Sequence, residues 1–315
     1  MYGTNEKGGG VDNLLYDYWP INDRPRIEWP SGARVAFWLG LNIEHYEVDK
    51  PSTGIFAGTT GLSPDPLNYG WRDYGPRVGL WRMAEVMERH GIRGSVLLNS
   101  DVCRRCPEII ELGSERNWVW LAHGRNNSIF QAGLSEDEER DYLSEVVDTL
   151  VKETGRSPKG WLGPALTETY NTPRLLSELG LTYVCDWCSD DQPFPLNVPG
   201  RRMISVPYSI EINDISLFVG KSLSGDGFYR AVMDQFEMLY ESASASGLVM
   251  SLAVHPFITG QPFRLKYLDR ILGAVAATKD VWLATSDEIA DYYLVHHYET
   301  ARESIERKRK GARTQ

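Results

Sequence analysis

The sequence lacks the long apolar segment that a membrane-spanning helix requires, because no run reaches about 18 apolar residues. The first residues, MYGTNEKGGGVDNLLYDYW, have neither the basic start nor the apolar core of a secretory signal. We therefore expect a cytoplasmic protein that does not enter a membrane. No G-x-G-x-x-G motif follows the first apolar segment, which argues against a dinucleotide-binding domain.

Basic residues are in deficit. The 315-residue chain has 33 Lys and Arg against 43 Asp and Glu, a net charge of −10 at pH 7. Proteins that bind nucleic acids or anionic membrane surfaces neutralise phosphates with clustered Lys and Arg. We therefore expect neither kind of partner. The charge balance favours solubility and a small neutral or cationic ligand.

Cysteine is scarce as well. The four cysteines form two C-x-x-C pairs, Cys103 with Cys106 and Cys185 with Cys188. The two pairs lie much farther apart than the roughly 15–20 residues typical of a four-thiolate zinc site, and disulfides are rare in a reducing compartment. We expect these side chains to act as small buried hydrophobic groups.

The sequence does contain a regular alternation of apolar segments with segments of helical periodicity. Strands that are apolar throughout and separated by helices are typical of a parallel sheet covered on both faces. The sequence thus predicts an α/β fold, an irregular (β/α)7-type barrel of parallel strands with outer helices, with an open doubly wound sheet as the alternative. Predicted strands are 33–44, 94–100, 118–124, 159–164, 181–187, 202–208, 247–256 and 281–284; predicted helices are 77–91, 102–115, 134–155, 172–180, 226–244, 263–278 and 286–297.

Three segments fall outside this alternation. Residues 1–32 are rich in Pro, Gly and Asp and form a predicted N-terminal extension to a barrel spanning 33–297. Residues 298–315 are predicted to be a charged, frayed tail. A long Gly-, Pro- and aromatic-rich loop is predicted over 46–75, and loops of this length in compact domains are usually functional.

Polar residues gather at the predicted carboxyl ends of the strands, where a β/α barrel carries its chemistry. Glu44, His123, Asp186 and His255 each follow a different strand. Singly, each could be a packed histidine, a solvated carboxylate or a turn cap. Together, at one rim, they can supply a general base, a general acid and an orienting partner. This convergence predicts a catalytic or binding site.

Six motifs occur along the chain in a fixed order: NIE (42–44), HGRNNS (123–128), GWLGPALTETYNT (160–172), CDWCSDDQP (185–193), SVPYSIEIND (205–214) and VHPFITGQPFR (254–264). In this order and spacing, over residues 17–297, the chain resembles the polysaccharide deacetylase family (NodB-homology, carbohydrate esterase 4-like). Within that family it is similar to the branch that contains the metal-independent allantoinase and related cyclic-amide hydrolases.

The resemblance bears on metal binding. Metal-using members carry an Asp pair after the first strand and H-x-x-x-H after the third, whereas this chain has Asn42 and Glu44, then His123 and Asn127. An amide is a poorer zinc ligand than imidazole. We therefore expect no cofactor, and we keep Glu44, His123 and Asn127 as the set that could hold a weakly bound divalent metal such as zinc.

The resemblance implies hydrolysis of a carbon–nitrogen bond other than a peptide bond, in a small cyclic or linear amide. In our hypothesis Glu44 is the base on water, His123 polarises the carbonyl and His255 protonates the leaving nitrogen. Asp186 would orient one histidine and fix its tautomer. Substrate-binding residues are expected from the rim and the long loop: Trp71, Arg125, Asn126, Trp161, Tyr208, Glu211 and Asn213.

Other functions remain open at this stage. One is a metal-dependent N-deacetylase of an amino sugar or oligosaccharide. The others are a noncatalytic small-molecule-binding barrel and a structural subunit. The expected partners are a small amide and water, and the allantoinase branch suggests a homo-oligomer.

Overall fold

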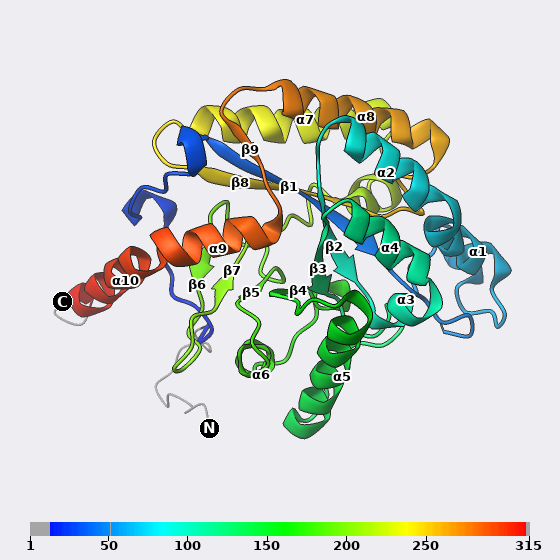
Figure 1. Cartoon of the computed structure of the whole chain (residues 1–315), viewed down its shortest axis with the longest axis horizontal. Coiled ribbons are helices and arrows are strands. Elements are labelled where there is room, and N and C mark those ends of the chain that lie inside the picture. Colours follow the sequence, from blue (N-terminus) through cyan, green and yellow to red (C-terminus); the bar gives the residue numbers. More distant parts are fainter. Residues whose placement is uncertain (1–12, 51, 313–315) are drawn as a thin grey trace.

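The computed structural model describes residues 13–50 and 52–312 (Figure 1). Residues 1–12, 51 and 313–315 lie outside the described residues, and with them parts of the predicted extension, loop and tail. Among the described residues, no helix combines the length and apolar character needed to cross a membrane.

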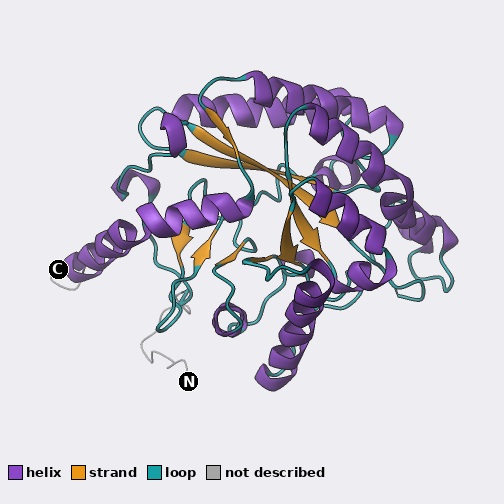
Figure 2. Ribbon diagram, viewed as in Figure 1, coloured by secondary structure: helices purple, strands orange, loops and turns teal. Residues whose placement is uncertain are grey.

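The strands form one sheet that curls into a half-barrel, which confirms the predicted fold class (Figure 2). Along the sheet the order is β6-β7-β5-β4-β3-β2-β1-β8, and β9 also pairs with β1. All neighbours are parallel except β6, which runs antiparallel to β7. The strands are β1 (Val35–Ile43), β2 (Gly94–Leu98), β3 (Val119–Ala122), β4 (Gly160–Trp161), β5 (Tyr183–Val184), β6 (Phe194–Pro195), β7 (Ile204–Ser205), β8 (Leu248–Val254) and β9 (Val281–Leu283).

Helices surround the sheet, with α7, α8 and α2 along one side and α9 lying across the strands on the other (Figure 1). Two π-helical segments, Gly75–Gly79 and Ile215–Gly220, adjoin the barrel rim. The α-helices are α1 (Pro66–Tyr74), α2 (Leu80–Arg89), α3 (Ser100–Arg105), α4 (Pro107–Glu115), α5 (Glu136–Thr154), α6 (Thr172–Glu178), α7 (Gly225–Ser242), α8 (Pro262–Ala277), α9 (Ser286–His296) and α10 (Tyr298–Ala312).

The side chains of β1 alternate between two apolar clusters, because successive residues of a strand point to opposite faces. Phe37, Leu39 and Leu41 belong to the cluster between the sheet and its helices. Trp38 belongs to the cluster inside the half-barrel, which α9 closes. Continued by two residues at a time, this inner face carries Asn42 and then Glu44. The alternation therefore directs the Glu44 carboxylate into the barrel at the carboxyl end of β1.

Helix α5 has the ends that its sequence predicts. Ser135 accepts a hydrogen bond from the backbone N–H of Glu138, and the Glu138 carboxylate accepts from the N–H of Ser135. This reciprocal capping box satisfies two N–H groups that a helix start leaves unpaired. Gly155 ends the helix with φ 68°, a left-handed conformation that favours glycine.

The segments that differ from the prediction include the long loop, the helix expected over 102–115 and the charged tail. The long loop contains α1, and the single helix expected over 102–115 is divided into α3 and α4 at Cys106. Cys106 precedes Pro107, and a residue before proline is disfavoured in the helical region. Cys103 and Cys185 are buried as expected, whereas Cys188 is exposed.

The charged tail is the third difference, because it forms α10 and packs on the molecule. Tyr298, Ala301 and Ile305 are buried along one face of this helix. Lys308 pairs with Asp23, and Arg309 pairs with Asp17. The prediction was wrong because many charged residues separate the three apolar residues, so their helical spacing is a weak signal in the sequence.

Candidate active site

Glu44 lies at the centre of a buried polar cluster at the carboxyl end of β1. Its Oε1 atom lies 3.2 Å from Nε2 of His123 and 3.6 Å from Nε2 of His255. The same oxygen accepts a hydrogen bond of 2.6 Å from Nδ2 of Asn127, and Oε2 accepts one from the Tyr46 hydroxyl. The structure thus brings three of the four predicted catalytic side chains together.

His123 follows β3, and its Nδ1 atom fixes the orientation of the ring. Nδ1 lies 2.6 Å from the backbone oxygen of Leu162. A carbonyl oxygen can only accept, so Nδ1 carries a proton and Nε2 is directed at Glu44. Leu162 directly follows β4, so the orientation of the imidazole depends on the neighbouring strand.

His255 follows β8 and forms a buried pair with Asp214. Nδ1 of His255 lies 2.6 Å from Oδ1 of Asp214, and Oδ2 of Asp214 accepts from the His255 backbone N–H at 2.7 Å and from the Thr259 hydroxyl at 2.6 Å. Burial alone lowers the pKa of His255, but the charges of Asp214 and Glu44 outweigh it and raise the pKa to about 10. His255 is therefore an imidazolium at neutral pH.

Glu44 is correspondingly a carboxylate. Burial raises its pKa, but the opposing attraction of His255 and the interactions with His123 are larger and hold the pKa well below its usual range. A carboxylate of this kind needs its charge balanced locally, because an unpaired buried charge is costly. The His255 imidazolium supplies that balance.

The orientation of Asn127 follows from a short chain of hydrogen bonds. The backbone N–H of His45 donates to Oδ1 of Asn99 at 2.9 Å, so Asn99 must offer its Nδ2 to Oδ1 of Asn127, 3.0 Å away. Asn127 is left with only its Nδ2 to present to Glu44. The amide oxygen that a metal would require is thus engaged elsewhere.

The donor set therefore does not fit a tightly bound metal. Of Glu44, His123 and Asn127, the third presents an N–H group rather than a lone pair. In the described ranges 13–50 and 52–312, no three His, Cys, Asp or Glu side chains are grouped to hold a metal ion.

The segment between β1 and α2 covers this cluster. The Arg72 guanidinium lies 4.7 Å from the centre of the Tyr46 ring. The rings of Trp71 and Phe257 pack edge to face, with their centres 4.8 Å apart. Phe257 in turn contacts the His255 ring at 5.5 Å. Beneath the cover, a cavity of about 20 Å³ is lined by Glu44, His45, Tyr46, Tyr69, Arg72, Asp73 and Pro76. This volume accommodates one water molecule.

Two of the predicted binding residues belong to the inner face of the barrel. The Tyr208 hydroxyl accepts from Nδ2 of Asn213 at 3.2 Å and from Nδ2 of Asn42 at 3.5 Å. Tyr208 and Glu211 also line a cavity of about 330 Å³. Glu211 itself is exposed and pairs with Lys221 at 2.8 Å.

The other predicted binding residues lie outside the polar cluster. Arg125 turns to α5, where it pairs with Glu145. Asn126 is buried and donates to Asp101 at 2.9 Å and to Glu47 at 3.2 Å. Trp161 is fully buried, and its Nε1 has no hydrogen-bond partner among the described residues.

The direct hydrogen bond predicted between Asp186 and a histidine is not found among the described residues. Asp186 hydrogen-bonds to neither histidine, and its Oδ1 accepts instead from the Gly163 backbone N–H at 2.7 Å. Asp214 orients His255 in its place, and sequence reasoning did not single it out for that role. The available signal was its position at the end of the motif SVPYSIEIND. Tyr46 and Asn99 were missed too, since tyrosine and asparagine carry no motif of their own.

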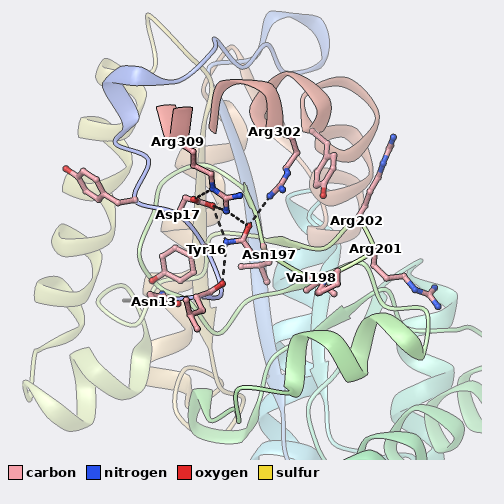
Figure 3. Close-up of a pocket in the computed structure, with 15 residues that line it drawn as sticks. Asn13, Tyr16, Asp17, Asn197, Val198, Arg201, Arg202, Arg302 and Arg309 are labelled. Atoms are coloured by element: carbon pink, nitrogen blue, oxygen red, sulfur yellow. Dashed lines mark hydrogen bonds and ion pairs between the residues drawn. The ribbon is translucent and has the colours of Figure 1, made fainter. Parts of the chain in front are cut away.

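A separate cavity is lined by none of the residues of this cluster. It measures about 1220 Å³ and is bounded by residues 13–18, the loop between β6 and β7, and α10. Asn197 links Arg302 and Arg309 there, and Asp17 holds Arg309 (Figure 3). None of its lining residues lines the cavity beside Glu44.

Comparison with known proteins places these features in context. No protein-family model matches the chain. A Schizosaccharomyces pombe protein named as a polysaccharide deacetylase is 25% identical over 332 residues, covering 94% of this chain and 99% of the relative. A crystal structure named as a polysaccharide deacetylase from Pseudomonas aeruginosa has a TM-score of 0.79 at 25% identity, covering 87% and 95% of the two chains. The crystal structure of the allantoinase PuuE has a TM-score of 0.78 at 25% identity, covering 92% and 99%.

Proposed function

We propose that this chain, which is similar over most of its length to polysaccharide deacetylases and to the allantoinase PuuE, is a hydrolase of carbon–nitrogen bonds other than peptide bonds and cleaves a small cyclic or linear amide. The reaction is of the allantoinase or imidase type and uses acid–base activation of water. The observation that carries the proposal is the Glu44 carboxylate lying between two histidines, one of them paired with Asp214.

Glu44 is the base on the attacking water. Its carboxylate lines the cavity of about 20 Å³, which has room for that one molecule. The neighbouring histidines hold the carboxylate ionised, so it is in the form that accepts a proton. As the proton reaches Glu44, its attraction for His255 weakens, and the imidazolium becomes a better acid.

His255 protonates the leaving nitrogen. Its Nε2 lies 3.6 Å from Glu44, too far for a good hydrogen bond, so this N–H is available to the substrate. Asp214 fixes the ring through Nδ1 and through the backbone N–H. The proton that Glu44 takes from water and the proton that His255 gives to nitrogen balance across one turnover.

His123 stabilises the oxygen of the tetrahedral intermediate. Its Nδ1 proton is fixed by the Leu162 carbonyl, so Nε2 is the atom that faces the reaction centre. A protonated Nε2 donates to the developing oxyanion, the charge that an amide hydrolase must stabilise. The Asn127 amide keeps Glu44 in place beside it.

A small substrate is supported by the cover over the site. Tyr69, Arg72 and Pro76 come from α1 and the following π-helical segment, and they narrow the cavity beside Glu44 to a volume that fits one water molecule. We expect this segment to move outward when the substrate enters, because the cavity beside Glu44 has no room for an amide substrate. A polymer would require an open groove here.

The test is hydrolysis of a panel containing a cyclic ureide, a cyclic imide and an N-acetyl amino sugar, before and after chelation. We expect turnover of a cyclic amide that survives chelation. We also expect His255→Gln to lower kcat by about 10²–10⁴-fold, the usual contribution of a general acid. His90→Gln is the matched control, because His90 forms a surface pair with Asp269, and its turnover should be unchanged.

Two results contradict the proposal. Turnover of the N-acetyl amino sugar alone, lost on chelation, would identify a metal-dependent N-deacetylase. Stabilisation by a panel compound without turnover, in protein that is folded, would identify a noncatalytic binder.

A further inference from the structure

A second pair of acidic groups lies at the carboxyl rim, between β4 and β5, and takes no part in the steps above. Asp186 lies two residues after the end of β5, and Glu168 lies in the segment after β4. The two carboxyl groups interact directly. Oδ1 of Asp186 accepts from the Gly163 N–H at 2.7 Å, and Oε2 of Glu168 accepts from Nε1 of Trp187 at 3.1 Å.

The remaining two oxygens have no donor. Oδ2 of Asp186 and Oε1 of Glu168 are closed off from solvent, and neither has a hydrogen-bond partner among the described residues. Two carboxylates cannot satisfy each other, since both only accept. One proton between them satisfies both oxygens and removes the like-charge repulsion.

The surroundings agree with a shared proton. Burial, followed by the charge of Asp186, raises the pKa of Glu168 well above its usual range. Burial also raises the pKa of Asp186 to about 7. The other titratable groups that act on the pair are Glu139 from α5, His123 just after β3, and Cys185 and Cys188 near Asp186 in the sequence.

A single peptide group connects this pair to the active site. Its carbonyl, from Leu162, accepts from Nδ1–H of His123, and its N–H, from Gly163, donates to Asp186. Hydrogen bonds arranged in such a chain polarise one another. A negative charge on Asp186 therefore makes the Leu162 oxygen a stronger acceptor for the Nδ1–H of His123.

We infer that Asp186 and Glu168 form a proton-sharing positioning pair, whose charge acts on His123 through the Leu162–Gly163 peptide group. The pair transfers no proton to the substrate. Its effect on turnover rests on the proposed function, in which His123 stabilises the oxyanion. Above about pH 7 Asp186 is ionised and strengthens the hydrogen bond that holds Nδ1 of His123, and below that pH this effect is lost.

Carbon-13 NMR of protein labelled at the Asp and Glu carboxyl carbons tests the pair without turnover. We expect one carboxyl to titrate near pH 7 and a second to stay protonated above it. Asp186→Asn should remove the first signal and lower the titration midpoint of the second, because the neighbouring charge is gone. Glu168→Gln should remove only the second. Asp287→Asn is the control, since Asp287 is a half-buried carboxyl with a pKa of about 6 that accepts a hydrogen bond from Tyr183 and lies outside the hydrogen-bond chain to His123.

The pH profile of kcat tests the effect on His123. Asp186→Asn should lower kcat by about tenfold above pH 8, as loss of an outer partner of a reacting histidine does, and should match the wild type below pH 6, where Asp186 is already neutral. Glu168→Gln should keep the wild-type profile, because its amide still donates to Asp186. A loss of equal size at every pH would show a merely structural role.

The outcomes separate this inference from the proposed function. Both carboxyls ionised at pH 6 would overturn the inference, whatever the enzyme hydrolyses. The expected titrations in a protein that hydrolyses no amide would retain the shared proton and refute the proposed function.

Discussion

Replacing Asp214 by asparagine tests the charge arrangement around His255 most directly. The substitution keeps the shape of the side chain and removes the charge that faces Nδ1 of His255. Removing one partner of a buried ion pair typically costs about 3–5 kcal/mol, and here Glu44 remains as the second carboxylate near His255. We expect a loss of this size in the free energy of unfolding at pH 6.5.

The dependence on pH gives an independent magnitude. His255 has its pKa raised from 6.5 to about 10 in the folded protein. A tenfold change in proton affinity between the folded and unfolded states corresponds to about 1.4 kcal/mol, so the rise in the pKa of His255 corresponds to on the order of 5 kcal/mol. Because the folded pKa is the higher one, this stability is fully present below pH 6.5 and is lost as pH rises toward 10. Asp214→Asn should remove most of that slope.

The assay is urea unfolding followed by tryptophan fluorescence between pH 6.5 and 10. Asp269→Asn is the matched control, because Asp269 pairs with His90 at the surface at 2.6 Å. An exposed pair contributes roughly 0–1 kcal/mol, so the control should change little. If Asp214→Asn retains the wild-type slope over this range, the reasoning about His255 is refuted.

Three further predictions concern Glu44, Asn127 and Ile305. Glu44→Gln should abolish measurable turnover, which steady-state kinetics checks. It should also reduce the loss of stability on acidification below pH 4.5, measured by acid unfolding, because the lowered pKa of Glu44 stabilises the fold only while the group is ionised. Asn127→His places a second imidazole four residues after His123, so zinc should raise the Tm of this variant more than that of the wild type. Ile305→Ala should cost about 2–5 kcal/mol by leaving a cavity under α10, whereas Val295→Ala, at an exposed position, should leave the urea midpoint nearly unchanged.

Much of the fold could be predicted because its signals are local. The apolar run that becomes β1 and the Ser135, Glu138 and Gly155 ends of α5 can each be read within a few residues. The antiparallel strand β6 could not, since it is only two residues long and one of them is proline. Its pairing with β7 depends on contacts that no local pattern expresses.

The active site was predictable in its members but not in its connections. Glu44, His123 and His255 were identified because each follows an apolar strand, and parallel strands bring their ends to one rim. Which acid serves which histidine depends on the path of the chain after each strand. Asp214 reaches His255 because the segment after β7 returns to β8, where Asn213 bridges Ala253. Asp186 also follows a strand in the sequence, but its carboxylate accepts a hydrogen bond from the Gly163 N–H instead.

The packing of α10 has a consequence for assembly. The sheet ends at β6, and an uncovered edge strand is a template for pairing with another chain. In the folded protein the Asn197 N–H just beyond β6 donates to the Leu15 oxygen, and α10 lies against the same edge. Both ends of the described chain thus act as a cover over the last strand. A truncation at either end would expose this edge. We expect the first sign to be aggregation by intermolecular strand pairing, before any change in the active-site geometry near β1 and β8, at the other end of the sheet.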